Sequence, residues 1–200
     1  MERDIVMPIL LISLLLLALT GTAGAGPLDG PGAPTAVICS ACHGFAGQSQ
    51  SNTMPILAGM APWYFKKALQ DFAAGKRTSP EMEPYAKQVV QFGLDDVAAY
   101  FAAQKRTVTP VASDPAAIER GRAAAAQCTL CHGASGKGDP AKGVPDLTGQ
   151  PPGYLKSQML LFKADKRSPG DAQLKVVKAL MATIPDEQLA DLAAYWSSVR

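Results

Sequence analysis

The chain has 200 residues, of which 48% are hydrophobic and only 6% aromatic, and its formal net charge is +2. A charge this small, without any run rich in lysine and arginine, excludes a strongly basic nucleic-acid-binding protein. The length suits one ordinary domain or two small ones. Alanine is abundant in the second half, and together with the scarcity of aromatic residues this favours helices over strands.

The first 25 residues have the pattern of a secretory signal. Ile9 to Leu19 are apolar apart from Ser13, and the small residues that follow end in Ala23-Gly24-Ala25. An apolar core of this length is too short to span a bilayer comfortably. We expect cleavage near Ala25 and export to the periplasm, with an uncleaved membrane anchor as the alternative.

The four cysteines and both histidines of the chain form two clusters, Cys39-Ser40-Ala41-Cys42-His43 and Cys128-Thr129-Leu130-Cys131-His132. Cys-x-x-Cys-His is the attachment signature of a c-type haem. Two thiols one helical turn apart can form thioethers with the two haem vinyl groups, and the next residue places an imidazole under the iron. The sequence therefore predicts two covalently bound haems c.

Three other interpretations of the cysteines fit less well. A zinc site needs about four closely grouped ligands, whereas the clusters lie 89 residues apart, from position 39 to position 128. A thioredoxin-like redox pair requires a surrounding βαβ pattern, and plain disulfides do not explain a histidine after both cysteine pairs.

The segments around the clusters are repeated as well. Pro55-Ile56-Leu57-Ala58-Gly59 corresponds to Pro145-Asp146-Leu147-Thr148-Gly149, 90 residues further on, and the same offset relates Tyr64 to Tyr154. It also relates Phe72 to Phe162 and Lys76-Arg77 to Lys166-Arg167. Near the end of each unit the offset becomes 95 and links Leu94, Val97, Ala98, Tyr100 and Phe101 with Leu189, Leu192, Ala193, Tyr195 and Trp196. A duplicated unit with a five-residue insertion explains both offsets, and these last segments carry the apolar stripe of an amphipathic helix.

The duplication predicts two domains, 26–107 and 114–200, joined by a linker at 108–113 that contains Pro110. The second domain opens with Asp114 as a helix N-cap and Pro115 in the first helical position. Gly121 in that helix offers a place for close approach of another helix. The first domain begins with the proline- and glycine-rich stretch before Cys39, which cannot form a long helix.

Two tandem Cys-x-x-Cys-His-Gly units, each with Pro-x-Leu and each ending in Ala-Ala-Tyr-aromatic, resemble the dihaem c-four type of class I cytochrome c. The resemblance covers essentially all of the mature chain. It implies an all-α fold of two tandem class I cytochrome c domains, each wrapped around one covalently bound haem. It also implies that the carbonyls of Pro55 and Pro145 accept hydrogen bonds from His43 and His132, which would fix the imidazole rings and tune the iron.

Cys39, Cys42, Cys128 and Cys131 are thus the predicted attachment residues, with His43 and His132 as axial ligands. Because both histidines are used, the sixth ligand must be another residue, and a thioether suits an electron carrier.

In the resembling family the distal methionine lies 18 residues before the tyrosine of the last helix, which is Met82 in the first domain. The same count gives Val177 in the second domain, and Val177 cannot ligate iron. We expect Met181, four residues later, to bind through a shifted loop. The alternatives are a five-coordinate haem or an unusual ligand, such as the amines of Lys175 or Lys178.

The sequence therefore predicts a periplasmic dihaem cytochrome that passes single electrons between redox proteins, such as a donor dehydrogenase and a terminal oxidase or reductase. It is an electron carrier and not an enzyme in this interpretation. The short lead of the first domain also resembles the haem subunit of flavocytochrome c sulfide dehydrogenase, which would make a flavoprotein the electron donor. A third alternative is a small-ligand catalyst at the second haem, if its iron is open.

Overall fold

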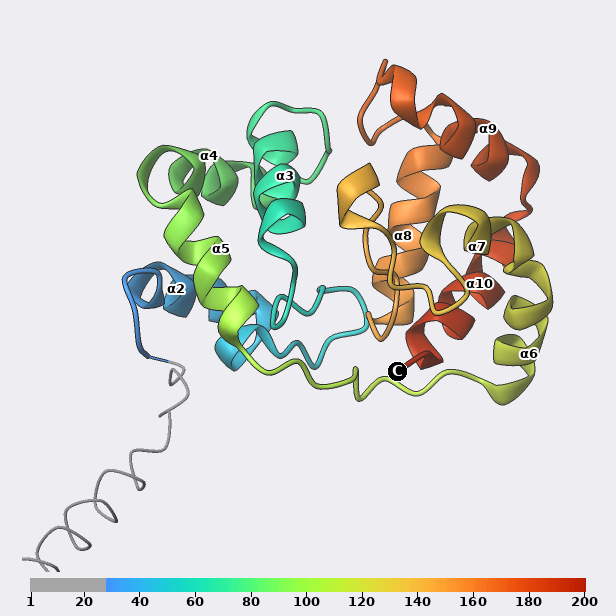
Figure 1. The fold of residues 1–200 in the computed structure, drawn as a ribbon, viewed down its shortest axis with the longest axis horizontal. Coiled ribbons are helices and arrows are strands. Elements are labelled where there is room, and N and C mark those ends of the chain that lie inside the picture. Colours follow the sequence, from blue (N-terminus) through green and yellow to red (C-terminus); the bar gives the residue numbers. More distant parts are fainter. Residues whose placement is uncertain (1–27) are drawn as a thin grey trace, which may run out of the picture.

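The computed structural model describes residues 28–200, whose regular elements are all helices, so the all-α prediction is confirmed for this part of the chain. The predicted signal segment 1–25 lies outside the described residues. The helices form two groups that lie side by side (Figure 1). The first group contains α2 (Ala33–His43), η1 (Phe45–Gly47), α3 (Pro62–Ala73), α4 (Met82–Phe92) and α5 (Leu94–Ala103). The second contains α6 (Pro115–Ala124), α7 (Ala126–His132), η2 (Pro140–Lys142), α8 (Pro152–Lys163), η3 (Ala172–Leu174), α9 (Lys175–Thr183) and α10 (Asp186–Ser198).

A segment without helix, residues 104–114, connects the two groups and runs along one edge of the molecule (Figure 1). Within the second group, α8 lies on the side that faces the first group (Figure 1). We propose that the two groups are the two domains predicted from the duplication. Across the described residues, the helices are all too short or too polar to span a lipid bilayer.

Each group has a hydrophobic core of its own, built from corresponding positions of the repeat. In the first core Val97, Ala98 and Phe101 of α5 are almost fully buried. Leu192, Ala193 and Trp196 of α10, which follow at the offset of 95, are equally buried in the second core. The last helix of each unit therefore buries its apolar stripe in the same way, as its periodicity predicts.

A glycine allows the last helix of each unit to approach the first one closely. A β-carbon added to Gly121 on α6 would lie 2.0 Å from the carbonyl oxygen of Asp191 on α10. A β-carbon added to Gly32, which precedes α2, would lie 2.2 Å from the carbonyl oxygen of Asp96 on α5. The close approach predicted at Gly121 is confirmed, and Gly32 plays the same part in the first unit.

The two units differ at their first helices. In the second unit α6 and α7 run from Pro115 to His132 with a break at Ala125. The first unit has only α2, which begins at Ala33 with Pro34 in its first turn. Proline is tolerated there because the amide that it lacks would have no helical partner.

Candidate haem sites

The first attachment motif forms the end of a helix. Cys39, Cys42 and His43 lie in the last two turns of α2, which ends at Gly44 with φ of 76°. A glycine adopts this left-handed conformation without the strain that a β-carbon causes. The second motif is built alike, since α7 ends at His132 and is followed by Gly133 with φ of 73°. All four cysteines are free thiols.

His43 is held by the residue that the family resemblance indicates. Its Nδ1 donates a hydrogen bond to the carbonyl oxygen of Pro55 at 3.0 Å, and the side chain is only 4% exposed. Its other ring nitrogen, Nε2, is buried and has no hydrogen-bond partner. A buried polar atom without a partner costs free energy unless a ligand satisfies it. The ring is thus fixed in the tautomer whose Nε2 lone pair is available to a metal.

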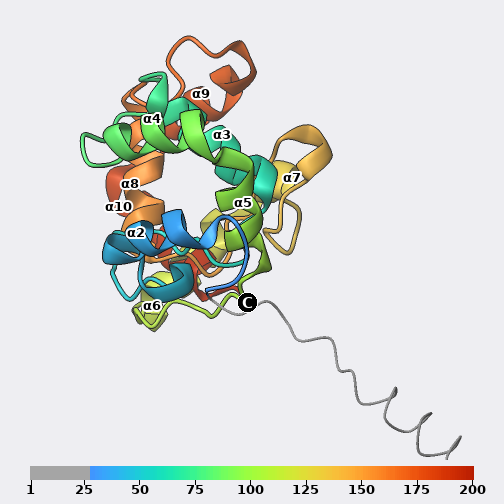
Figure 2. The ribbon, with the colours of Figure 1, turned by 90° about the vertical axis from the view of Figure 1, so that its left-hand side faces the viewer.

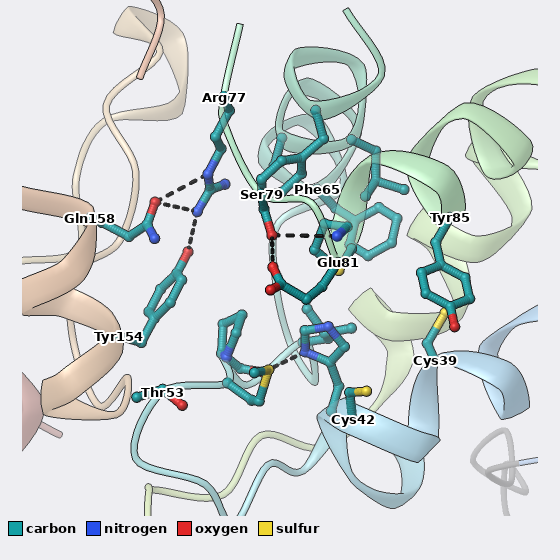
Figure 3. A pocket seen from close by; sticks show the side chains of 18 of the residues that line it. Cys39, Cys42, Thr53, Phe65, Arg77, Ser79, Glu81, Tyr85, Tyr154 and Gln158 are labelled. Atoms are coloured by element: carbon teal, nitrogen blue, oxygen red, sulfur yellow. Dashed lines mark hydrogen bonds between the residues drawn. The ribbon is translucent and has the colours of Figure 1, made fainter. Parts of the chain in front are cut away.

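That ring borders a cavity of about 410 Å³. Residues of α2, α3, α4 and α8 line it. Figure 2 looks at the first group from its outer side and shows α2, α4 and α5 around its middle. The lining is mostly apolar and includes Cys39 and Cys42 on one side and Met82, Tyr85 and Val89 of α4 on another. Figure 3 shows Cys39 and Cys42 on α2 beside this space, with Tyr85 nearby.

The environment of the motif favours the neutral forms of His43 and Cys39. Burial lowers the pKa of His43, and the hydrogen bond to Pro55 opposes this effect only in part. Burial also raises the pKa of the Cys39 thiol. Two free thiols next to an unpaired imidazole nitrogen, at the wall of an apolar cavity, fit the thioethers and axial ligand of a c-type haem.

The second domain repeats the proximal half of this arrangement. His132 Nδ1 donates a hydrogen bond to the carbonyl oxygen of Pro145 at 2.8 Å. Burial lowers the pKa of His132, although the Pro145 hydrogen bond and the nearby Asp146 carboxylate act in the opposite direction. Burial raises the pKa of Cys128, whose side chain packs against the second core. Both prolines predicted to accept from a histidine therefore do so.

The candidates for the distal side, opposite each histidine, are placed differently in the two domains. Met82 is the first residue of α4 and lines the cavity. Met181 lies on α9, is 6% exposed and belongs to the second core. Val177, on the same helix, is partly buried against that core. Ligation by Met181 stays a prediction.

The second domain closes one side of the first domain's cavity. Tyr154 and Gln158 of α8 line it together with residues of the first domain. Arg77, which is 3% exposed, donates to the hydroxyl of Tyr154 at 2.8 Å and to Oε1 of Gln158 at 2.7 Å (Figure 3). Arg167 donates to the same Gln158 oxygen at 3.1 Å and to the hydroxyl of Tyr64 at 2.8 Å.

These two arginines place positive charge in a buried position between the domains. Burial by itself would raise the pKa of Tyr64, but the positive charges of Arg167 and Arg77 outweigh it and lower that pKa to about 8. Burial raises the pKa of Tyr154, and the charge of Arg77 opposes this. The repeated Lys-Arg pair and the repeated tyrosine are visible in the sequence, but the contact of each arginine with the tyrosine of the other domain was not predicted.

Two further contacts attach the second domain to the first. Gln150 Oε1 accepts from the amide of Ile56 at 2.9 Å, and Gln150 Nε2 donates to the carbonyl of Ile56 at 2.8 Å. Asn52 accepts at the first turn of α8, with its Oδ1 from the Gly153 amide and its carbonyl from the Tyr154 amide, both at 2.9 Å. Ile56 directly follows the proline that holds His43, so the second domain helps to fix the first domain's proximal loop. Neither contact was predicted, because nothing in a single sequence marks a glutamine or an asparagine as a contact across a domain boundary.

Comparison with known proteins agrees with this geometry. The family model for cytochrome c matches residues 118–200. Cytochrome c4 of Pseudomonas aeruginosa is 36% identical over 194 residues, which are 93% of this chain and 96% of that protein. The thiosulfate dehydrogenase electron acceptor of Stutzerimonas stutzeri is 29% identical over 98% of this chain and 96% of its own length.

Solved structures show the same relationship. The crystal structure of reduced recombinant cytochrome c4 from Pseudomonas stutzeri superposes with a TM-score of 0.74 at 29% identity, over 86% of this chain and all of that chain. The thiosulfate dehydrogenase TsdBA from Marichromatium purpuratum has a TM-score of 0.72 at 26% identity, over 86% of this chain and 39% of that chain. With the duplicated attachment motifs and the two helical units, these matches establish that the chain belongs to the cytochrome c4 family of dihaem electron-transfer cytochromes.

Proposed function

We propose that the protein carries single electrons through one haem c in each domain. Cys39 and Cys42 hold the first haem, and Cys128 and Cys131 hold the second. The observation that carries this assignment is the partnerless, buried Nε2 of His43 beside two free thiols at an apolar cavity. Each bound haem supplies an iron that changes its oxidation state by one electron.

The protein supplies the ligands and their orientation. The Pro55 and Pro145 carbonyls hold the imidazoles of His43 and His132 with Nε2 unprotonated and free to donate its lone pair to iron. Met82 lines the same cavity as His43, which supports its assignment as the sixth ligand of the first haem. A thioether ligand raises the haem potential, as an electron carrier in an oxidising compartment requires.

The buried arginines are suited to the acidic groups that every haem c carries. Arg77 lines the first cavity, and its side-chain hydrogen bonds go to the neutral oxygens of Tyr154 and Gln158. A buried cation is stabilised by an anion within reach, and a guanidinium can bind a carboxylate in bidentate fashion. We propose that Arg77 and Arg167 neutralise haem propionates at the domain boundary, where an electron passes from one domain to the other.

Redox proteins are the partners of such a carrier. One of the relatives is named as the electron acceptor of thiosulfate dehydrogenase and aligns along nearly its entire length. We propose a dehydrogenase as donor, with a terminal oxidase or reductase as acceptor. An electron-accepting subunit bound to a flavoprotein remains the second candidate, and copurification with a flavin-containing chain would distinguish it from a freely diffusing carrier.

The proposed compartment is the periplasm, because the first 25 residues have the pattern of an export signal and c-type haems occur in exported proteins. Fractionation of cells that express the full chain tests this: the haem-containing protein should appear in the periplasmic fraction with about 25 residues removed. Recovery of the intact chain in the membrane fraction would support the anchored alternative.

Haem content tests the attachment sites. The double variants Cys39→Ala/Cys42→Ala and Cys128→Ala/Cys131→Ala should each keep one covalent haem, measured by haem absorbance per chain and by the mass of the denatured protein. Ser40→Ala, between two of the cysteines, is the matched control and should keep both haems. Two haems in either double variant, or none in the unaltered protein, would contradict the proposal.

A further inference from the structure

The internal repeat provides a register in which the distal sides of the two haems can be compared. Gly32 approaches Asp96 and Tyr100, and Gly121 approaches Asp191 and Tyr195, so contacts in one unit recur at the offsets of 89 and 95 in the other. The offset of 95 places Val177 at the position of Met82. It places Met181 at the position of Ala86.

That register separates residues that line the cavity from residues that do not. In the first domain Met82, Tyr85 and Val89 line the cavity, whereas Ala86 is fully buried and does not line it. Met181, which corresponds to Ala86 in this register, is likewise buried. We therefore expect Met181 to fill core volume, which is the common role of a buried methionine.

The two lysine amines of α9 that could serve as distal ligands are either hydrogen-bonded or exposed to solvent. Lys178 donates to the carboxylate of Asp165 and to the carbonyl of Ser168. Lys175, at the start of α9, is exposed. Ligation by either lysine would require the loss of an ion pair or a reorientation of the first turn of α9.

The same register predicts which side chains surround the distal face of the second haem. Phe65 and Leu69, which line the first cavity, correspond to Leu155 and Met159 at the offset of 90. Met82, Tyr85 and Val89 correspond at the offset of 95 to Val177, Leu180 and Ile184. All five residues of the second domain lie in or against its hydrophobic core. At these five positions the second domain is apolar, and the one polar group among the five in the first domain, the phenol of Tyr85, is replaced by leucine.

An apolar wall selects the kind of ligand that can enter. Moving an anion into such surroundings costs much free energy unless a hydrogen-bond donor compensates, whereas a small neutral molecule pays little. Distal polarity and steric access decide what a haem iron binds. We propose that the iron held by His132 is open on its distal side and, when reduced, binds a neutral diatomic molecule such as carbon monoxide or nitric oxide. This proposal rests on the second haem proposed above.

Carbon monoxide titration of the reduced protein tests this proposal. The protein should first be shown to contain two covalent haems, so that a missing second haem, which would refute the proposed function, is recognised separately. The expected stoichiometry is one carbon monoxide for every two haems. Near-infrared magnetic circular dichroism of the oxidised protein should show one methionine-ligated haem.

A reciprocal pair of substitutions sharpens the test. Val177→Met should abolish carbon monoxide binding and add a second methionine-ligated haem. Met82→Val should open the first haem and double the amount of carbon monoxide bound. Met181→Leu should leave carbon monoxide binding unchanged, and this variant keeps the proposal testable if Val177→Met fails to fold.

Two results would overturn the proposal. One is a protein with two haems that binds no carbon monoxide. The other is a new carbon monoxide site created by Met181→Leu or by Met159→Leu, since either would reveal a thioether on the second iron. Tighter binding of cyanide to the oxidised second haem than of carbon monoxide to the reduced one would refute the neutral class of ligand.

Discussion

The two domains agree on the proximal side of each haem site and differ on the distal side. His43 and His132 follow a Cys-x-x-Cys pair at the end of a helix, and each donates to the carbonyl of a proline. For the distal side, the register of the repeat proposes Met82 in one domain and Val177 in the other. Covalent attachment fixes the geometry of the proximal residues, so that side tolerates little change. The distal residue sets the reduction potential of the haem and the access of ligands to its iron, and it can change while the haem remains attached.

A second difference concerns how the domains support one another. Gln150 of the second domain binds both backbone groups of Ile56 in the first. The residue at the corresponding place in the first domain is Met60, which has no group that could make such a pair. The first domain's proximal loop is therefore held by Gln150, whereas the loop after Pro145 is held by Arg106, which donates to the Asp146 carboxylate and to the Thr148 carbonyl.

The largest expected effect comes from the glycines between the first and last helices. Gly121→Ala would place a β-carbon 2.0 Å from the Asp191 carbonyl oxygen, and Gly32→Ala would place one 2.2 Å from that of Asp96. We expect each to lower the free energy of unfolding by about 3 kcal/mol, the upper part of the usual cost of overpacking. Denaturant unfolding followed by circular dichroism measures this.

The comparison between the units decides what that result means. If the units are equivalent here, the two variants lose similar stability, and each perturbs the absorbance of the haem in its own domain. Ala124→Gly, on the same helix as Gly121, is a control for loss of helix propensity without a clash, with an expected cost of about 1 kcal/mol. Full stability of Gly121→Ala would show that the two helices are not in contact as described.

A smaller effect is expected from the link between the domains. Gln150→Leu removes both hydrogen bonds to Ile56 and leaves two buried backbone groups without partners, which costs about 1–3 kcal/mol. Because Ile56 follows the proline that holds His43, the first haem's potential should change and the second's should not. Spectroelectrochemical titration separates the two potentials.

Gln158→Leu serves as a comparison, because it lies at the same boundary but binds Arg77 and Arg167 rather than the proximal loop. A shift confined to the second haem in Gln150→Leu would contradict the idea that the second domain supports the first domain's histidine.

The smallest expected effect is on the stability of the protein at low pH. Arg120 on α6 binds Asp191 on α10 through two hydrogen bonds of 2.8 Å, and these lower the pKa of Asp191 below its ordinary value of 3.8. A carboxyl group whose pKa is lowered by folding stabilises the protein above its unfolded pKa and loses that contribution as the pH falls through its folded pKa. Arg120→Gln should therefore be slightly less stable than the unaltered protein at neutral pH, and the difference should vanish as the pH falls through the lowered pKa of Asp191.

Thermal unfolding across this pH range measures the difference. Position 31, which corresponds to Arg120 in the first domain, is a proline. The first domain should consequently lack this acid sensitivity, and a stability difference that persists unchanged into acid would rule out the ion pair as its cause.

The sequence was sufficient for the features that follow from local chemistry. The two attachment motifs, the duplicated unit, the close approach at Gly121 and the all-helical fold were all predicted, because spacing and helical periodicity encode them. The prolines that accept from His43 and His132 were identified through the family resemblance. Arg77, Arg167, Gln150 and Asn52 were missed as contacts between domains, since their partners lie 77 to 103 residues away in the chain. Repetition of the arginine and the tyrosine at the same offset of 90 was the one signal that could have indicated such a meeting.

The way those arginines meet also bears on the origin of the molecule. Arg77 donates to Tyr154 and Arg167 donates to Tyr64, and the backbones of Arg77 and Arg167 pair with each other as an antiparallel bridge. The arginine of each unit thus contacts the repeated tyrosine of the other unit. The same contact occurs twice with the two units exchanged, which is the self-complementary pattern of a twofold homodimer. We infer that the ancestor was a single-haem protein that paired with a second copy of itself before the two genes were fused. Fusion keeps the two proposed haem sites together at any protein concentration, so that one copy could change its distal residues while the other retained them.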